Sequence, residues 1–288
     1  MDIALYLETA RYLRPTQVWH QVAHRFRRPM LTSEHSPVTA ATGICHLMTA
    51  PIVKPRCYDG QGRFTFLNIG DTFRGWDMDG HGALWAYNLN YMDWLCQEDV
   101  TPGECVEWID RFIDALPSNR VGQDPYPTAL RVVNWAKFFS LHPECRSQRR
   151  LDSMYAQTLL LERKLEYHLL GNHLLEDAYA LYIAAHFFAD RRLLRKAETL
   201  LHGQLREQTL ADGAHYEQSA MYHCILLDRL LDCINFSGGE RWEVGSGRNV
   251  LPQSNLSPLT PHPKNSPLTL HPHPPTPTPQ VPSPPMPR

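Results

Sequence analysis

Two short polar segments, each at the start of an apolar stretch, hold the residue types in this chain that are best suited to chemistry. Residues 171–176 read GNHLLE and residues 212–223 read DGAHYEQSAMYH. Asn172 and Glu176 are one helical turn apart and share a face, whereas the adjacent Tyr222 and His223 point about 100° apart. An amide and a carboxyl group opposite a phenol or an imidazole can bind an acidic, hydroxyl-rich molecule and move a proton. We therefore expect the two segments to face each other across one cleft.

Each of these residues also has a purely structural interpretation. Asn is a preferred N-cap, so Asn172 is also explained as a residue that satisfies backbone donors at the helix start. Ser219 has the same ambiguity before the next helix, and a single tyrosine such as Tyr222 is commonly a core or rim residue. Spacing alone leaves both interpretations open.

Apolar residues recur at helical spacing through most of the chain, which predicts an all-α fold. Thr101, Pro102 and Glu104 form a helix start signal, with a cap, a proline at the first helical position and the carboxylate of a capping box. We expect one short strand at residues 64–69 and an irregular connection at residues 31–58. Helices are expected at residues 5–26, 101–116, 130–138 (preceded by Pro125 and Pro127), 151–170, 174–188, 193–205 and 222–234. Successive antiparallel hairpins of this kind are typical of a helical bundle or an α/α toroid.

The composition changes abruptly after Phe236, which divides the chain into a helical domain at residues 1–236 and a proline-rich tail at residues 237–288. Proline with Ser, Thr and His cannot bury a core, so we expect a disordered or polyproline II segment. A natural tail is one explanation. A truncated chain is the favoured one, because the last helix is apolar at Leu226, Leu227, Leu230 and Leu231 and so predicts further packing partners.

The bulk composition excludes several classes of function. The formal net charge of the 288 residues is −2, which gives no electrostatic argument for a nucleic-acid partner. The seven cysteines are scattered without Cys-x-x-Cys spacing, and neither a metal site nor a cofactor is expected. No window approaches the roughly 20 apolar residues of a membrane span. Because no signal peptide is evident, we expect a cytoplasmic protein as written, and a periplasmic one if a leader is missing.

Four ordered motifs together carry a family resemblance. They are WAYNLNYMDWL at residues 85–95, DPYPTALRVVNW at residues 124–135, GNHLLE at residues 171–176, and the residue 212–223 segment with its Glu217, Gln218, Ser219, Tyr222 and His223. In this order they resemble the N-terminal helical domain of heparinase II/III-like polysaccharide lyases, over about residues 2–236.

The resemblance implies an incomplete α/α toroid that cleaves a uronic-acid-containing, glycosaminoglycan-like polysaccharide by β-elimination. Asn172 would pair with the uronate carboxylate and stabilise the developing enolate, and Tyr222 would act as general acid/base. Arg131, His173, Glu176 and His223 would line the site or orient the substrate, since a guanidinium suits a carboxylate or a sulfate. The expected partner is the acidic polysaccharide, with neither nucleic acid nor membrane.

The chain also departs from the family pattern. Such lyases continue into further toroid helices and a β-sandwich domain, which contributes another catalytic histidine. His262, His271 and His273 lie in the proline-rich tail and do not match its position. The resemblance therefore implies half a site, which the missing β-sandwich domain would normally complete, and doubtful activity for the chain by itself.

Two other functions remain open from the sequence. In a noncatalytic glycan-binding domain, the aromatic residues Trp85, Tyr87, Trp94 and Trp135 would stack on sugars. In a toroid glycoside hydrolase, paired carboxylates such as Glu176 and Glu217 would act at a defined separation.

Overall fold

The computed structural model describes residues 13–26, 29–39, 47 and 49–238. The chain divides into two units at residues 1–245 and 246–288, and every described residue belongs to the first. The predictions for the first twelve residues and for the proline-rich tail after residue 238 lie outside the described residues.

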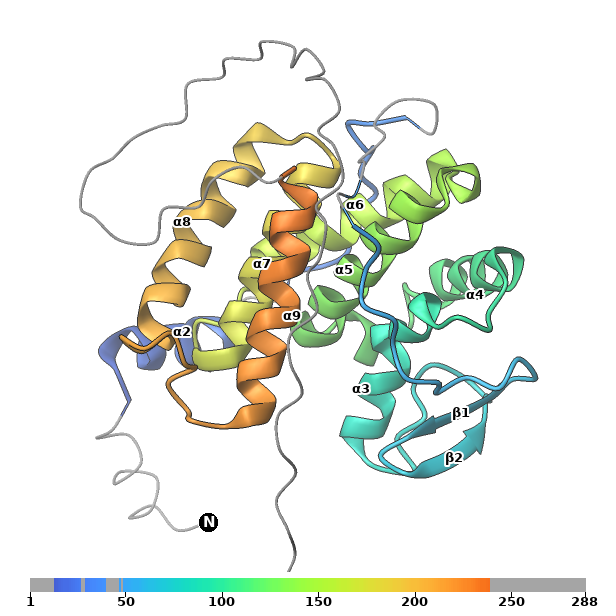
Figure 1. Ribbon diagram of the computed structural model, residues 1–288, viewed down its shortest axis with the longest axis horizontal. Helices are drawn as coiled ribbons and strands as arrows, with labels where there is room; N and C mark the ends of the chain where they lie inside the picture. The colour runs from blue at the N-terminus through green and yellow to red at the C-terminus, as the bar shows by residue number, and fades with distance from the viewer. Residues whose placement is uncertain (1–12, 27–28, 40–46, 48, 239–288) are drawn as a thin grey trace, which may run out of the picture. The chain divides into compact units, whose positions relative to one another are not determined.

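The prediction of an all-α fold is confirmed (Figure 1). The α-helices of the described residues are α2 (Pro15–Phe26), α3 (Ala83–Tyr91), α4 (Pro102–Ala115), α5 (Pro125–Leu141), α6 (Gln148–Arg163), α7 (Gly171–Phe187), α8 (Arg191–Gln208) and α9 (Ala220–Phe236). Short 3-10 turns occur at η1 (Asp93–Cys96), η2 (Val121–Gln123) and η3 (Pro143–Cys145), and strands at β1 (Arg63–Phe66) and β2 (Ile69–Thr72).

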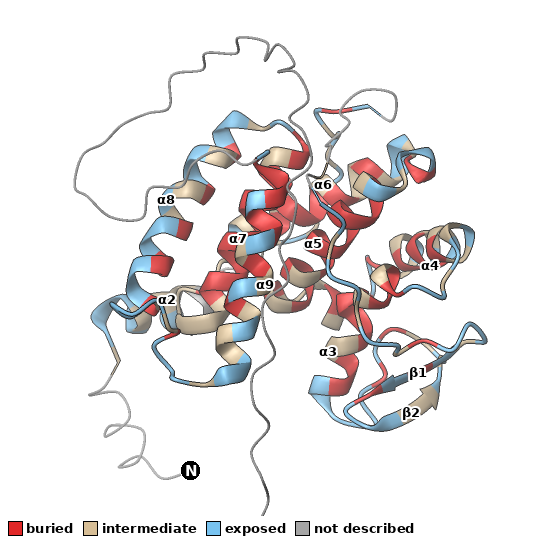
Figure 2. Ribbon diagram, viewed as in Figure 1, coloured by how far each residue is buried: buried red, intermediate tan, exposed pale blue. Residues whose placement is uncertain are grey.

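Helix α7 is the central element of the helical domain. Its sequence, GNHLLEDAYALYIAAHF, is apolar on all sides, and it is buried almost throughout against α5, α6, α8 and α9 (Figure 2). Small residues such as Ala178, Ala180 and Ala184 let the neighbouring helices approach closely. Helix α8 is strongly amphipathic instead, and it packs one face on α7 while its charged face is exposed.

The expected strand at residues 64–69 is a two-stranded antiparallel hairpin. Leu67 and Asn68 both have positive φ, 54° and 62°, which is the backbone of a type I′ turn and reverses the chain within the predicted strand. Alternation along β1 buries Phe64 and Phe66, whose rings lie 5.3 Å from Trp94 and 5.2 Å from Trp85 between centroids. The hairpin is thus attached to the helices by aromatic contacts.

Helix α9 is packed on one side and exposed on the other. Leu226 is buried, whereas Leu227 is 44% exposed and Leu231 is 52% exposed. The buried side carries polar residues, Arg229 and Asp232 among them, so the helix does not follow a simple apolar stripe. These two polar residues connect α9 to α7 and to α5 by ion pairs.

The start signal of α4 is confirmed in full. The Thr101 hydroxyl accepts a hydrogen bond from the Glu104 backbone N–H, and the Glu104 carboxylate accepts one from the Thr101 backbone N–H. This reciprocal pair satisfies two backbone donors that the first turn leaves open.

We predict that Thr101→Ala lowers the free energy of unfolding by about 1 kcal/mol, because the N-cap acceptor is lost. Urea denaturation measures the change. Thr199→Ala makes the same chemical substitution at an exposed position inside α8 and should leave the midpoint nearly unchanged. Equal midpoints for the two variants would show that the capping box does not stabilise α4.

Candidate functional site

Asn172 lies at the start of α7 and does not cap it. The cap position is Leu170, with no side-chain hydrogen bond, and both Leu170 and Gly171 have positive φ as the chain turns into the helix. The Asn172 side-chain nitrogen Nδ2 donates to the Tyr126 hydroxyl at 3.3 Å. The capping interpretation is therefore wrong for this residue, and its amide points toward α5 instead.

His173 stands beside the same tyrosine. Its ring centroid is 4.6 Å from that of Tyr126, and its Nδ1 lies 3.1 Å from Glu166 Oε2. Glu166 reaches this place because α6 ends at Arg163, seven residues before the predicted end, and the chain turns back toward α7. The Glu166 backbone N–H then donates to the buried Asp177 carboxylate at 2.8 Å, which fixes the turn.

Three tyrosines form a continuous layer behind Asn172 and His173. The ring of Tyr126 lies 5.9 Å from Tyr91, and Tyr91 lies 6.5 Å from Tyr87, whose hydroxyl donates to Asp124. Burial raises the pKa of all three phenols above the usual value, and the Glu176 carboxylate adds to the effect at Tyr126. The three hydroxyl groups therefore stay protonated at neutral pH.

Tyr222 is half-buried at the start of α9, and its ring centroid lies 5.7 Å from that of the buried His215. The Glu217 backbone N–H donates to His215 Nδ1, so Nε2 carries the proton that faces Gln208 Oε1 at 3.4 Å. Gln208 in turn donates to the Gly171 carbonyl at 2.9 Å. This chain of contacts connects the start of α9 to the start of α7.

The two helix starts also meet through Tyr126. It is hydrogen-bonded to Asn172, and the Tyr222 phenol is close enough to raise the pKa of Tyr126, after burial and Glu176. His223 is half-buried, and its Nδ1 is buried without a hydrogen-bond partner among the described residues. Asn172 and His173 contact Tyr126, while Tyr222 packs on His215 at the start of α9, and these residues make up the candidate site.

Glu176 lies one turn below Asn172 and is paired within the protein. It is buried and accepts a hydrogen bond from Arg229 Nε at 2.9 Å. Arg229 also approaches Asp228 and Asp232 on α9, at 3.3 and 3.5 Å. Lys137 of α5 pairs with Asp232, and Lys54 pairs with Asp228 at 2.7 Å. This buried ion network holds α9 against α5 and α7. It also fixes the position of Glu176, whose carboxylate helps to raise the pKa of Tyr126.

Arg131 was expected to orient the substrate, and the structure places it in the core. It is fully buried, its guanidinium lies 4.2 Å from the Phe112 ring centroid, and it donates to Gln157 and to the backbone carbonyls of Asn90 and Gly122. Burial lowers the pKa of Arg131 to about 9. Its role here is to connect α3, η2, α5 and α6, and no surface is left for a substrate.

The residues named for the two other functions are placed differently from what those functions require. Trp85, Trp94 and Trp135 are buried in the core, so these three cannot stack on sugars. Tyr87 is half-buried and bonded to Asp124. For a hydrolase, Glu176 is buried against Arg229 while Glu217 is exposed beside Tyr216, so they are not presented as a matched pair.

Sequence reasoning missed Tyr126, Glu166 and Arg229. Tyr126 lies inside a quoted motif, and its place between Pro125 and Pro127, just before an expected helix, was a usable signal. Glu166 was hidden by the overlong helix prediction. Arg229 is 53 residues from Glu176, and nothing in a linear pattern reveals such a pair.

Within residues 13–26, 29–39, 47 and 49–238, no group of three or more His, Cys, Asp or Glu side chains is placed to hold a metal ion. The helices described for this chain include none that is long and apolar enough to cross a bilayer. The six cysteines in the described ranges are free thiols, and Cys45 lies outside them.

Removing Arg229 should destabilise the domain strongly. Arg229→Met leaves Glu176 buried without its partner, and we expect a loss of about 3 kcal/mol in the free energy of unfolding. Adding Glu176→Gln to that variant should recover part of the loss, and Arg195→Met at an exposed position of α8 should cost little. A double variant no more stable than Arg229→Met would contradict the pairing.

Asp177 should make the stability depend on pH. Burial and the neighbouring Glu166 hold the pKa of Asp177 well above its usual range. Between the unfolded pKa and the raised folded pKa, the folded state keeps a proton that the unfolded state loses, so this contribution to stability falls as pH rises. Asp177→Asn should therefore gain stability relative to the natural protein between about pH 4 and about pH 7.

Urea midpoints at several pH values measure this difference, with Asp77→Asn as the exposed control. A difference between Asp177→Asn and the natural protein that does not change with pH would mean that Asp177 is ionised in the folded state.

Comparison with known proteins supports the family resemblance over part of the chain. Residues 149–255 match the family model described as heparinase II/III N-terminus. The match covers α7, α8, α9 and nearly all of α6, and it therefore includes Asn172, His173 and Tyr222, whereas the motifs at residues 85–95 and 124–135 lie outside it. No curated protein and no solved structure matches the chain. The family match confirms the resemblance over these residues, which are similar to the N-terminal domain of heparinase II/III.

Proposed function

We propose that this helical domain belongs to a polysaccharide lyase that acts on a uronic-acid-containing, glycosaminoglycan-like polysaccharide by β-elimination. The observation that carries the proposal is the convergence on Tyr126. Asn172 and His173 at the start of α7 contact this side chain, and the Tyr222 phenol at the start of α9 adds to the rise in its pKa, after burial and Glu176. The two segments are the ones that the family match covers.

The substrate carboxylate is assigned to Asn172. A side-chain amide has two N–H groups, and one of them is occupied by the Tyr126 hydroxyl. The other is available to a uronate carboxylate. A neutral donor at this place stabilises the negative charge that builds up on the carboxylate when the adjacent carbon loses its proton.

The proton transfers are assigned to Tyr222. The base removes the proton from the carbon next to the carboxylate, and the electron pair of that bond forms the new carbon–carbon double bond. The bond to the glycosidic oxygen breaks with its electron pair on oxygen, and that oxygen receives a proton from the acid. We assign the orientation of the sugar to His173, which Glu166 holds, and to His223.

Incubating the whole chain with sulfated and unsulfated uronate polysaccharides tests the assignment. We expect products with an unsaturated end, detected by the ultraviolet absorbance of the conjugated double bond. Tyr222→Phe should reduce the rate at least about 100-fold, because it removes the acid/base group. Asn172→Ala should also reduce it strongly.

Tyr167→Phe is the matched control, because it removes a hydroxyl from a half-buried tyrosine with no hydrogen bond to that hydroxyl among the described residues. Saturated product ends would indicate a hydrolase. No cleavage of any uronate polysaccharide, or equal rates for Tyr222→Phe and Tyr167→Phe, would contradict the proposal.

A further inference from the structure

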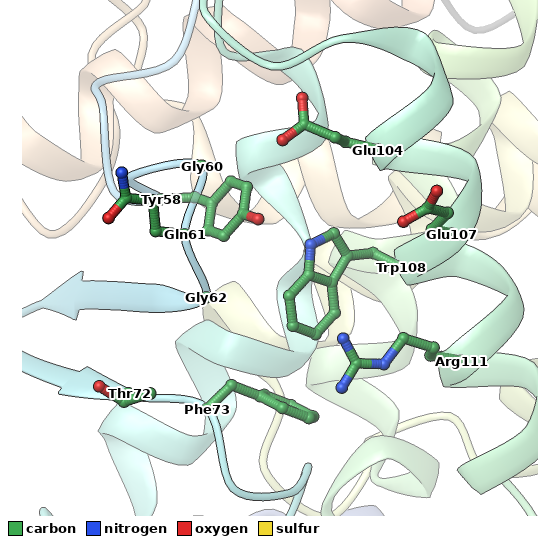
Figure 3. Close-up of a pocket in the computed structure, with 10 residues that line it drawn as sticks. All are labelled: Tyr58, Gly60, Gln61, Gly62, Thr72, Phe73, Glu104, Glu107, Trp108 and Arg111. Atoms are coloured by element: carbon green, nitrogen blue, oxygen red, sulfur yellow. The ribbon is translucent and has the colours of Figure 1, made fainter.

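A second surface, remote in sequence from the candidate site, has features of a ligand site. It is a hollow of about 390 Å³ between the turn at Gly60–Gly62 and the α4 residues Glu104, Glu107, Trp108 and Arg111 (Figure 3). We call it the α4 hollow. Its volume is in the range of small-molecule sites, and it shares no lining residue with the Tyr126 cluster.

Two buried aromatic residues present unpartnered polar atoms to the α4 hollow. Tyr58 is only 4% exposed and Trp108 only 5% exposed. Neither the Tyr58 hydroxyl nor the Trp108 indole N–H has a hydrogen-bond partner among the described residues, and Figure 3 shows both directed into the space between the turn and α4. Both groups open onto the hollow, so a bound molecule with acceptor atoms can take their hydrogen bonds.

Charged groups with spare hydrogen-bonding capacity border the same space. The Arg111 guanidinium lies 4.2 Å from the Trp108 ring centroid and 5.0 Å from that of Phe73, which holds it flat without a carboxylate partner in the described chain. Glu107 is exposed and makes no ion pair or hydrogen bond there. Glu104 uses one oxygen, Oε2, for Thr101, while its Oε1 faces Gly60 at the hollow.

The glycines of the turn keep the hollow open. Gly60 and Gly62 have φ of +82° and +87°, a backbone that side-chain-bearing residues rarely adopt. The Asp59 carboxylate accepts hydrogen bonds from the Gln61 and Arg63 backbone N–H groups, which fixes the turn. The turn opposite α4 is therefore held by hydrogen bonds to its own backbone, and the Gln61 side chain also lines the hollow.

The chemistry of this lining selects the ligand class. Donors from Tyr58, Trp108 and Arg111 alternate with acceptors from Glu104 and Glu107, and a hydroxyl group can both donate and accept. Two carboxylates against one guanidinium give the lining a net negative charge, which disfavours a uronate. We propose that the α4 hollow binds an uncharged sugar unit. This proposal does not depend on lyase activity.

Nuclear magnetic resonance of the whole chain tests the site. The seven tryptophans give one indole N–H signal each, and Trp108→Phe identifies the signal of Trp108. Titration with glucose or N-acetylglucosamine should move that signal, and titration with glucuronate should move it much less. Tyr58→Phe and Glu107→Gln should each weaken binding about 3- to 10-fold, the loss expected for one hydrogen bond.

Three controls make the result decisive. Tyr58→Phe should leave the urea midpoint unchanged, because the hydroxyl has no partner in the described protein. Glu98→Gln, at an exposed glutamate of the η1–α4 loop, and Tyr222→Phe should both bind like the natural chain. The proposal is overturned if neither neutral sugar moves the Trp108 signal up to about 100 mM, a weak-binding limit. It is also overturned if glucuronate binds as tightly, or if Tyr58→Phe and Glu107→Gln bind like Glu98→Gln.

Discussion

The buried ion network around Arg229 is the interaction on which the candidate site depends. Arg229 meets Glu176 of α7, and Lys137 of α5 meets Asp232 of α9, so three helices that are distant in sequence are fixed relative to one another. A buried charge is tolerated only when its partners remain in place, because an unpaired one costs several kcal/mol. The ion pairs therefore select one orientation of α9 against α5 and α7, which the apolar contacts of its leucines alone would not do.

The layer of Tyr87, Tyr91 and Tyr126 is the second constraint, because its hydroxyl groups are uncharged. Tyr87, Tyr91 and Tyr126 stay protonated because burial disfavours the phenolate. They therefore add hydrogen-bond donors and apolar surface to the candidate site without adding charge. The charges nearby are paired, with Glu176 on Arg229 and Glu166 on His173, whereas the half-buried Asn172 amide is neutral.

The parts of the structure that local chemistry determines could be predicted from the sequence. The capping box of α4, the proline at the start of α5 and the apolar periodicity of α7 act within one or two turns, and each was found as expected. The polar segments at Asn172 and Tyr222 were also recognisable. The roles of Arg131, Glu176 and Lys137 were not, because burial depends on which helices pack together. The Leu67–Asn68 turn was missed because leucine rarely adopts positive φ.

Helix α9 is restrained very unevenly along its length. Its second half carries Arg229, Asp232 and Asn235, which are buried and bonded to α7, to Lys137 and to Thr49. Its first turn has no side-chain cap, follows Gln218 with φ of 53°, and exposes Met221. Displacing that first turn therefore requires less free energy than displacing the second half. The helix is therefore fixed at its far end, and a local displacement of the turn that carries Tyr222 would leave the buried half in place.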